Sequence, residues 1–294
     1  MGTTPHAHSQ PDSLPPATPE ERLQVVLREL ERRFGPWIVY RLKDARPTLH
    51  PRAIPSGALS LDLVLGIGGY PRGRVSDIVG PASSGKSILS FHLLANAQRQ
   101  GGFVALVDAA HQASFEQMRR CGVDLADLFL VVPETTHETF EIATLLIESG
   151  GLDALVIDGV ADLVGESIAA GRLAADGLTR LSAVMHRTPT AVVVLTRPRL
   201  RPAAIPLSRT LRHGASIRLA ITPLRPLLHP SGDIVGLRVA VVAIKNKLAP
   251  AGRRTELDLR RDRGIHAAAD LFDLGRARGV LDETSLGLCF DGRV

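Results

Sequence analysis

The chain has 294 residues, of which 45% are hydrophobic and 22% charged, a balance typical of a soluble globular protein with one large domain. No apolar run approaches the roughly 18 residues needed to cross a bilayer, so we expect no membrane partner. The two cysteines, Cys121 and Cys289, lie far apart without metal-ligand spacing. This argues against a disulfide framework and a zinc site, and it favours a cytoplasmic location.

The formal net charge of +5 is unevenly distributed along the chain. Residues 177–232 contain nine arginines and three histidines but no aspartate or glutamate. A surface of this kind suits a polyanion such as nucleic acid. The alternative interpretation is a solvated basic face that has no partner.

The N-terminal region predicts a small helix that must dock on something. Thr18, Pro19 and Glu21 form a capping-box signature, and an apolar stripe follows as far as Phe34, where Gly35 ends the helix. A helix this short is unstable alone, so it docks either on a neighbouring subunit or on its own core. The expected organisation is a disordered tail over 1–17, an N-terminal helix and strand over 18–45, a Pro-rich linker over 46–55 and a main core over 56–294.

Beyond the linker, strand-like and helix-like patterns alternate, which predicts an α/β fold with a mostly parallel central sheet flanked by helices. The last two expected strands follow each other without a helix between them, so antiparallel strands should close one end of the sheet. The expected strands are 74–79, 103–107, 128–132, 154–158, 191–195, 216–221 and 237–244, and the expected helices are 88–97, 138–148 and 173–186.

A phosphate-binding loop is predicted between the first of these strands and the first helix. Its pattern is G-x-x-x-x-G-K-[ST], in which the glycines let backbone N–H groups point at an anion. Lys86 would reach the β and γ phosphates, and the hydroxyl of Ser87 would hold Mg²⁺. A chance Gly/Ser turn is the alternative. The predicted nucleotide-binding residues here are Gly80, Pro81, Ala82, Ser83, Ser84, Gly85, Lys86 and Ser87.

The strand over 154–158 ends in Asp158, at the edge where open α/β sheets place their ligand chemistry. An acid in this position after a buried strand is typical of a Walker B motif, and Asp158 would bind Mg²⁺ through water or Ser87. A plain turn residue is the alternative. The predicted cofactors are therefore ATP and Mg²⁺.

The segment over 56–74 leads into the phosphate-binding loop and, together with it, resembles the bacterial RecA recombinases. The likeness extends to residues 121–124, 215–219 and 245–247, and it runs from about Glu20 to Leu281. The resemblance implies a RecA-like P-loop core and nucleotide-dependent DNA chemistry. Most of the small C-terminal domain that follows the core in RecA is expected to be absent, which suggests a reduced paralogue.

The departures from that family fall on residues that carry chemistry. In RecA the strand after the P-loop is followed by a glutamate that activates water, and Ala110 stands in its place, so the resemblance implies that ATP hydrolysis is weak or lost. Replacement of the missing base by Asp108 or His111 is the alternative. The residues that contact adenine in the family fall on Gln117 and Ser114, which leaves base selectivity open.

The DNA contacts implied by the resemblance are also altered. The expected first DNA loop, 164–171, is short, and the second, about 198–214, lacks its paired glycines and is rich in arginine. The γ-phosphate-sensing pair becomes Thr196 and Arg197. Lys245 and Lys247 match lysines that in RecA reach the ATP of the adjacent subunit, although a solvated lysine pair is the alternative. The predicted DNA-binding residues are Arg197, Arg199, Arg201, Arg209 and Arg212.

These features favour a RecA-like ATP-binding protein of DNA repair, recombination or the damage response, which binds single-stranded DNA or a RecA-type filament and forms homo-oligomers. An active DNA-dependent ATPase recombinase is one alternative. A protein-interaction module of the ImuA type, with translesion polymerases as partners, is another.

Overall fold

The computed structural model describes residues 18–35, 39, 52–198, 202–284 and 287–290. The chain divides into two compact units, residues 1–49 and 50–294. The described part of the first unit is α1 (Pro19–Phe34), whose Thr18 cap and Glu21 form the predicted capping box. None of its residues is buried. The predicted tail over 1–17 lies outside the described residues, as do most of the residues between Gly35 and the linker, where the N-terminal strand was expected.

The second unit is built on a nine-stranded sheet, counted over the described residues, in the order β11-β10-β9-β8-β3-β7-β6-β4-β5. The six strands from β8 to β5 run parallel, and β9, β10 and β11 are antiparallel, which confirms the predicted fold class. The strands are β3 (Arg74–Val79), β4 (Phe103–Asp108), β5 (Leu128–Val131), β6 (Leu152–Asp158), β7 (Ala191–Thr196), β8 (Ile217–Leu228), β9 (Ile234–Asn246), β10 (Arg254–Arg260) and β11 (Gly264–Ile265).

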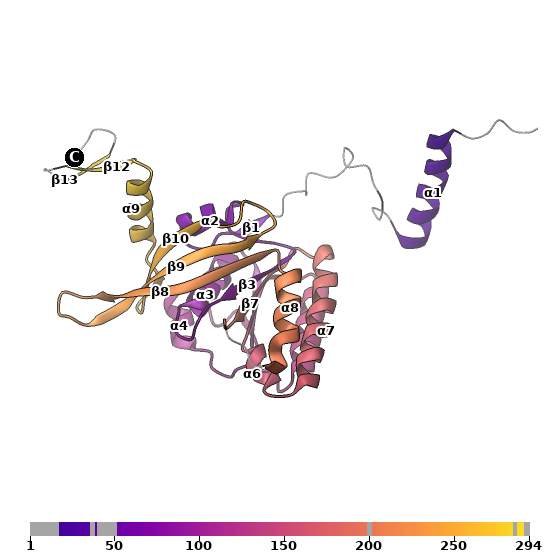
Figure 1. Cartoon of the computed structure of the whole chain (residues 1–294), viewed down its shortest axis with the longest axis horizontal. Coiled ribbons are helices and arrows are strands. Elements are labelled where there is room, and N and C mark those ends of the chain that lie inside the picture. The colour runs from indigo at the N-terminus through magenta and orange to yellow at the C-terminus, as the bar shows by residue number, and fades with distance from the viewer. Residues whose placement is uncertain (1–17, 36–38, 40–51, 199–201, 285–286, 291–294) are drawn as a thin grey trace, which may run out of the picture. The chain divides into compact units, whose positions relative to one another are not determined.

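Helices cover both faces of this sheet because both faces of its strands are apolar. On β4, Val104 and Leu106 face a core shared with α3, whereas Ala105 and Val107 face a core shared with α5, α7 and α8. α7 and α8 lie side by side on that second face (Figure 1). The helices are α2 (Leu59–Leu65), α3 (Lys86–Arg99), α4 (Phe115–Arg120), α5 (Thr136–Glu148), α6 (Val160–Val164), α7 (Ile168–Val184), α8 (Ile205–Gly214) and α9 (Ala267–Ala277), with short 3₁₀ turns at Met185–Arg187 and Pro202–Ala204.

The structure corrects the expectations about both DNA-facing segments. α7 begins at Ile168, so the second half of the expected first loop, 164–171, is helical. The residues expected to form a loop over 198–214 contain α8, which accounts for most of the part described. Pro206 stands in its first turn, and Leu207 and Leu211 form a buried face at i and i+4. The apolar spacing of residues 205–214 therefore indicates an amphipathic helix. The expectation of a loop came from the resemblance to RecA and was wrong for these residues.

Two further differences concern the ends of elements. β8 and β9 are longer than expected and form a hairpin that projects beyond the sheet (Figure 1). The expected linker over 46–55 overlaps β1 (Ala53–Ile54), which pairs with β2 (Tyr70–Pro71) in the main unit. β12 (Leu281–Thr284) and β13 (Gly287–Phe290) pair after α9. Within the described residues, no helix is long and apolar enough to span a membrane.

Candidate nucleotide-binding site

The phosphate-binding loop joins β3 to α3 and is seated tightly on two other strands. Gly85 has φ +92°, a conformation that favours glycine, and a Cβ there would lie 2.2 Å from Cδ1 of Leu259. A Cβ on Gly80 would lie 2.3 Å from Cγ2 of Ile221. The close approach of the loop to β8 and β10 therefore favours glycine at both positions.

Lys86 begins α3 and folds back across the loop. Its Nζ donates hydrogen bonds to the carbonyl oxygens of Gly80, at 3.0 Å, and Pro81, at 2.7 Å. Burial lowers the pKa of Lys86, Asp158 opposes that effect, and Arg197 adds to it. The ammonium thus lies at the loop within electrostatic range of both Asp158 and Arg197.

The predicted magnesium ligands lie beside each other at the ends of α3 and β6. The hydroxyl of Ser87 donates to Oδ2 of Asp158 at 3.4 Å. Burial is the largest cause of a raised pKa at Asp158; the nearby carboxylate of Asp108 adds to it, while Lys86 opposes it. Within the described residues no three His, Cys, Asp or Glu side chains gather as a metal site. The hydroxyl of Ser87 and the carboxylate of Asp158 could supply two oxygen ligands to a Mg²⁺ ion, which would take its other ligands from phosphate and water.

The turn after β4 carries no acid at the position of Ala110. Both carboxylate oxygens of Asp108 accept backbone hydrogen bonds, from Gln112 N at 3.1 Å and Ala113 N at 2.9 Å, so this side chain shapes the turn. His111 is exposed and has φ +56°. Ala110 packs against Gly159, which follows the end of β6. A Cβ added to Gly159 would lie 2.4 Å from the Cβ of Ala110. A methyl group therefore stands next to the Asp158 end of the strand.

A cavity of about 490 Å³ opens beside the phosphate-binding loop. Gln117 on α4 lines it, whereas Ser114 caps that helix by accepting a hydrogen bond from Gln117 N at 3.3 Å. The rest of the wall was missed by the sequence analysis, because it comes from the β8–β9 hairpin and from the end of β10, far along the chain. Those residues are Pro226, Ile234, Gly236, Leu237, Leu259, Arg260 and Arg261.

Thr196 and Arg197, which replace the phosphate-sensing pair, have separate surroundings. The hydroxyl of Thr196 donates to the buried carboxylate of Asp77 at 2.7 Å, and Nε of Arg218 donates to the other oxygen at 2.7 Å. Thr196 is thus tied inside the sheet. Arg197 is about half exposed and lies 3.3 Å from the carboxylate of Asp162.

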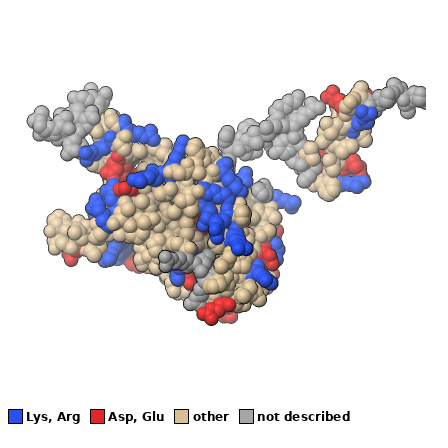
Figure 2. Space-filling model, in the orientation of Figure 1, with Lys and Arg blue, Asp and Glu red and all other residues tan. Residues whose placement is uncertain are grey.

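Two predicted sets of cations come together at α8. Arg209 and Arg212 are carried by this helix, and Nζ of Lys245 donates to the carbonyl oxygens of Arg212, at 2.5 Å, and His213, at 3.0 Å. Lys247 donates to the carbonyl of His213 at 3.3 Å. We call Arg209, Arg212, Lys245 and Lys247 the α8 patch, and Figure 2 shows lysine and arginine atoms gathered over the area that carries α8.

The two lysines neutralise the negative end of the α8 dipole. Burial lowers the pKa of Lys245, as do Lys247 and Arg218 beside it. Arg197 contacts Asp162, and its charge also contributes to the lowered pKa of Lys86. Arg199 and Arg201 lie outside the described residues.

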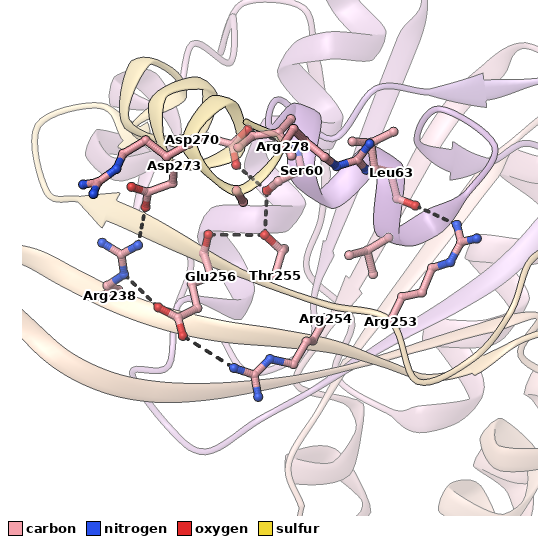
Figure 3. Close-up of a pocket in the computed structure, with 14 residues that line it drawn as sticks. Ser60, Leu63, Arg238, Arg253, Arg254, Thr255, Glu256, Asp270, Asp273 and Arg278 are labelled. Atoms are coloured by element: carbon pink, nitrogen blue, oxygen red, sulfur yellow. Dashed lines mark hydrogen bonds and ion pairs between the residues drawn. The ribbon is translucent and has the colours of Figure 1, made fainter. Parts of the chain in front are cut away.

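A larger cavity, about 770 Å³, lies between α2, β10 and α9, and none of the predicted site residues lines it. Its charges largely pair with one another (Figure 3): Arg238 contacts Glu256 at 3.0 Å and also Asp273. The buried carboxylate of Asp270 accepts hydrogen bonds from the backbone and hydroxyl of Ser60. These contacts hold α9 against α2 and β10, so we regard this cavity as structural.

Comparison with known proteins agrees with this arrangement. The family model of the RecA N-terminal domain matches residues 21–266. Protein RecA of Geobacter sulfurreducens is 34% identical over 291 residues, which cover 93% of this chain and 86% of that protein. Protein RecA of Thermus thermophilus is 37% identical over 279 residues, with 89% and 82% covered, and that of Chloroflexus aurantiacus is 35% identical over 280 residues, with 89% and 80% covered. The chain is similar to these proteins over nearly its whole length, and its P-loop and mostly parallel sheet agree with that similarity. The chain therefore belongs to the RecA family.

Proposed function

We propose that this chain is an ATP-binding protein of DNA recombination and repair that holds ATP with Mg²⁺ and hydrolyses it weakly or not at all. The observation that carries the proposal is the contrast between a complete phosphate-binding loop after β3 and Ala110 in the turn after β4. In this proposal ATP acts mainly as a bound ligand that orders the protein.

The binding half of the proposal rests on three side chains and the loop backbone. Lys86 would exchange its bonds to the carbonyls of Gly80 and Pro81 for bonds to phosphate oxygens, which are stronger because both partners are charged. Ser87 and Asp158, already 3.4 Å apart, would hold Mg²⁺. The ion would neutralise phosphate charge, and it would keep Asp158 ionised despite the burial that raises its pKa.

The proposal that hydrolysis is weak or absent rests on the missing general base. A methyl group at Ala110 neither accepts a proton nor orients water, and general-base groups supply about 10²- to 10⁴-fold in rate. Asp108 is poorly suited to replace it because both its oxygens accept backbone N–H groups. Arg197, near Lys86, would contact phosphate and provide charge but no base.

We further propose that the α8 patch binds single-stranded DNA through phosphate. Its cations lie together on one face, no ion pair of the described residues engages the guanidinium groups of Arg209 and Arg212, and phosphate contacts give affinity without reading sequence. Because Lys245 and Lys247 hold the end of α8 in the same subunit, their predicted role at a neighbour's nucleotide requires them to leave these carbonyls.

Self-association is the remaining part of the proposal. The apolar stripe of α1 is exposed, with Leu23 at 52% and Phe34 at 65%, and a short amphipathic helix needs a partner surface. The edge strand β5 also exposes Phe129. We expect Leu23→Glu with Phe34→Glu to lower the mass measured by light scattering; an unchanged mass would contradict a role for α1.

The main experiment measures ATP binding and turnover on the same preparation, with and without single-stranded DNA. Stoichiometric binding with negligible turnover in both conditions supports the proposal. Turnover that rises strongly with DNA would identify an active DNA-dependent ATPase instead. Absence of binding would show that the P-loop has no nucleotide function in this chain.

DNA binding is tested by its dependence on salt. Four phosphate contacts predict a log–log slope near −3, at about 0.7 per contact, and Arg209→Ala with Arg212→Ala should reduce its magnitude by about 1.4. Arg254→Ala, an exposed arginine outside the α8 patch, is the matched control. An unchanged slope in the double variant would remove the α8 patch from the DNA site.

A further inference from the structure

The wall of the nucleotide cavity beyond the phosphate-binding loop contains no aromatic ring among the described residues. Its apolar part comes from the β8–β9 hairpin and Leu259, and its polar side chains are Gln117, Arg260 and Arg261. If the phosphates lie on the loop, as proposed above, the base must lie against this wall. The chemistry of these side chains then decides which base is accepted.

Hydrogen bonds hold the three parts of the wall together before any ligand binds. Nη1 of Arg120 on α4 donates to the carbonyl of Arg261 at 3.2 Å, and the backbone N–H of Arg261 donates to the carbonyl of Val235 at 2.9 Å. Gln117 lies one helical turn before Arg120 on α4. Gln117 and Arg261 are therefore brought to the same cavity by contacts between α4, the end of β10 and the hairpin.

The polar side chains of the wall differ in whether they already have hydrogen-bond or ion-pair partners in the protein. Arg260 is paired with Asp262, at 3.0 and 3.4 Å. Within the described residues, no hydrogen bond or ion pair involves the amide of Gln117 or the guanidinium of Arg261, and Arg261 is exposed. A planar donor group and an amide with both donor and acceptor are thus available to a base.

We infer that this site accepts guanine as well as adenine, with Arg261 as the residue that favours guanine; the inference rests on the proposed binding of a nucleoside triphosphate. A guanidinium donates two hydrogen bonds to O6 and N7 of guanine, and an amide pairs with N6 and N7 of adenine. Gln117 serves adenine and Arg261 serves guanine on the same edge of the purine. None of the described residues that line the cavity is a carboxylate, so no acceptor of that kind favours the amino group of adenine.

The test is displacement of a fluorescent ATP analogue by ATP, GTP and CTP. GTP should compete within about threefold of ATP, and CTP should be weaker than both, because pyrimidines lack this edge. Arg261→Ala should weaken GTP about tenfold while changing ATP by less than about threefold. Gln117→Leu should weaken ATP more than GTP. Arg263→Ala, a neighbouring arginine that does not line the cavity, is the control.

Two results would overturn the inference while leaving the proposed function intact. GTP binding more than about 30-fold weaker than ATP in the unchanged protein would show adenine selectivity. Equal weakening of ATP and GTP by Arg261→Ala would place this guanidinium on phosphate. Failure of both nucleotides to bind would instead overturn the proposed function, and this inference with it.

Discussion

The turns after β3 and β4 lie at the same edge of one sheet, separated by β7 and β6, and they differ in what they retain. The turn after β3 keeps both glycines, Lys86 and Ser87, whereas the turn after β4 has Ala110 and uses Asp108 to hold its own backbone. Phosphate binding depends on backbone shape and one ammonium; hydrolysis depends on a single base. In the proposed function, the turn after β3 therefore holds the nucleotide, and the turn after β4 supplies no base for its hydrolysis.

The largest effect is expected from Lys86→Ala, which removes the charged partner of the phosphates. ATP affinity should fall by about 100-fold or more, since charge-assisted phosphate contacts are among the strongest in a binding site. Isothermal titration calorimetry measures it, with Arg254→Ala as control. Unchanged affinity would mean that the turn after β3 is as inactive as the turn after β4, and the comparison would fail.

The next effect concerns Ala110→Glu, which places a carboxylate beside the Asp158 end of β6. A very low ATPase rate should rise by about 100-fold, within the range of general-base catalysis. Ala110→Gln has similar size but no base and should leave the rate low. A rate already high in the unchanged protein, and equal in all three forms, would show that another group activates water.

Asp108→Ala should mainly lower stability, because two backbone N–H groups in the turn lose their acceptor. We expect a loss of about 2 kcal/mol in the free energy of unfolding and a smaller loss for Asp108→Asn, which keeps one acceptor. Denaturant unfolding measures both. If Asp108→Asn abolishes the remaining turnover without changing stability, the carboxylate has a catalytic role and the β4 turn is less reduced than proposed.

The smallest effect is a loss of protein stability in acid, which we expect from His92 on the helix that follows the P-loop. His92 on α3 accepts a hydrogen bond from Ile265 N at 2.8 Å, and burial lowers its pKa to about 4. The neutral ring is favoured in the fold, whereas an unfolded histidine titrates near pH 6.5, so stability falls as pH drops from about 6.5 towards 4. The loss should be about 1 kcal/mol at pH 5.5.

His92→Gln keeps an acceptor that does not titrate, and it should flatten the pH dependence of stability across this range. Thermal unfolding of both proteins between about pH 5 and 7.5 measures the difference. The same slope in both proteins would assign the acid sensitivity to other groups.

The local patterns of the sequence were sufficient to predict most of the strands of the sheet and the P-loop side of the candidate site. Strand, glycine turn and helix occur together at the P-loop, so its position needs only contacts within a few residues. Asp158 is placed in the same way, by the end of an apolar strand, whereas Ala110 was singled out only through the resemblance to RecA. The chain order of strands and helices also predicted the mostly parallel sheet and its antiparallel end.

The tertiary structure decided what lies around these residues. Arg261 and the β8–β9 hairpin reach the P-loop cavity from far along the chain, and no local pattern marks that approach. The position of Lys245 at the end of α8 and the engagement of Asp108 likewise depend on where carbonyl and N–H groups lie after folding. Periodicity and motifs report on neighbours along the chain, whereas the partner of a long charged side chain is set by packing between elements, and only the folded chain shows it.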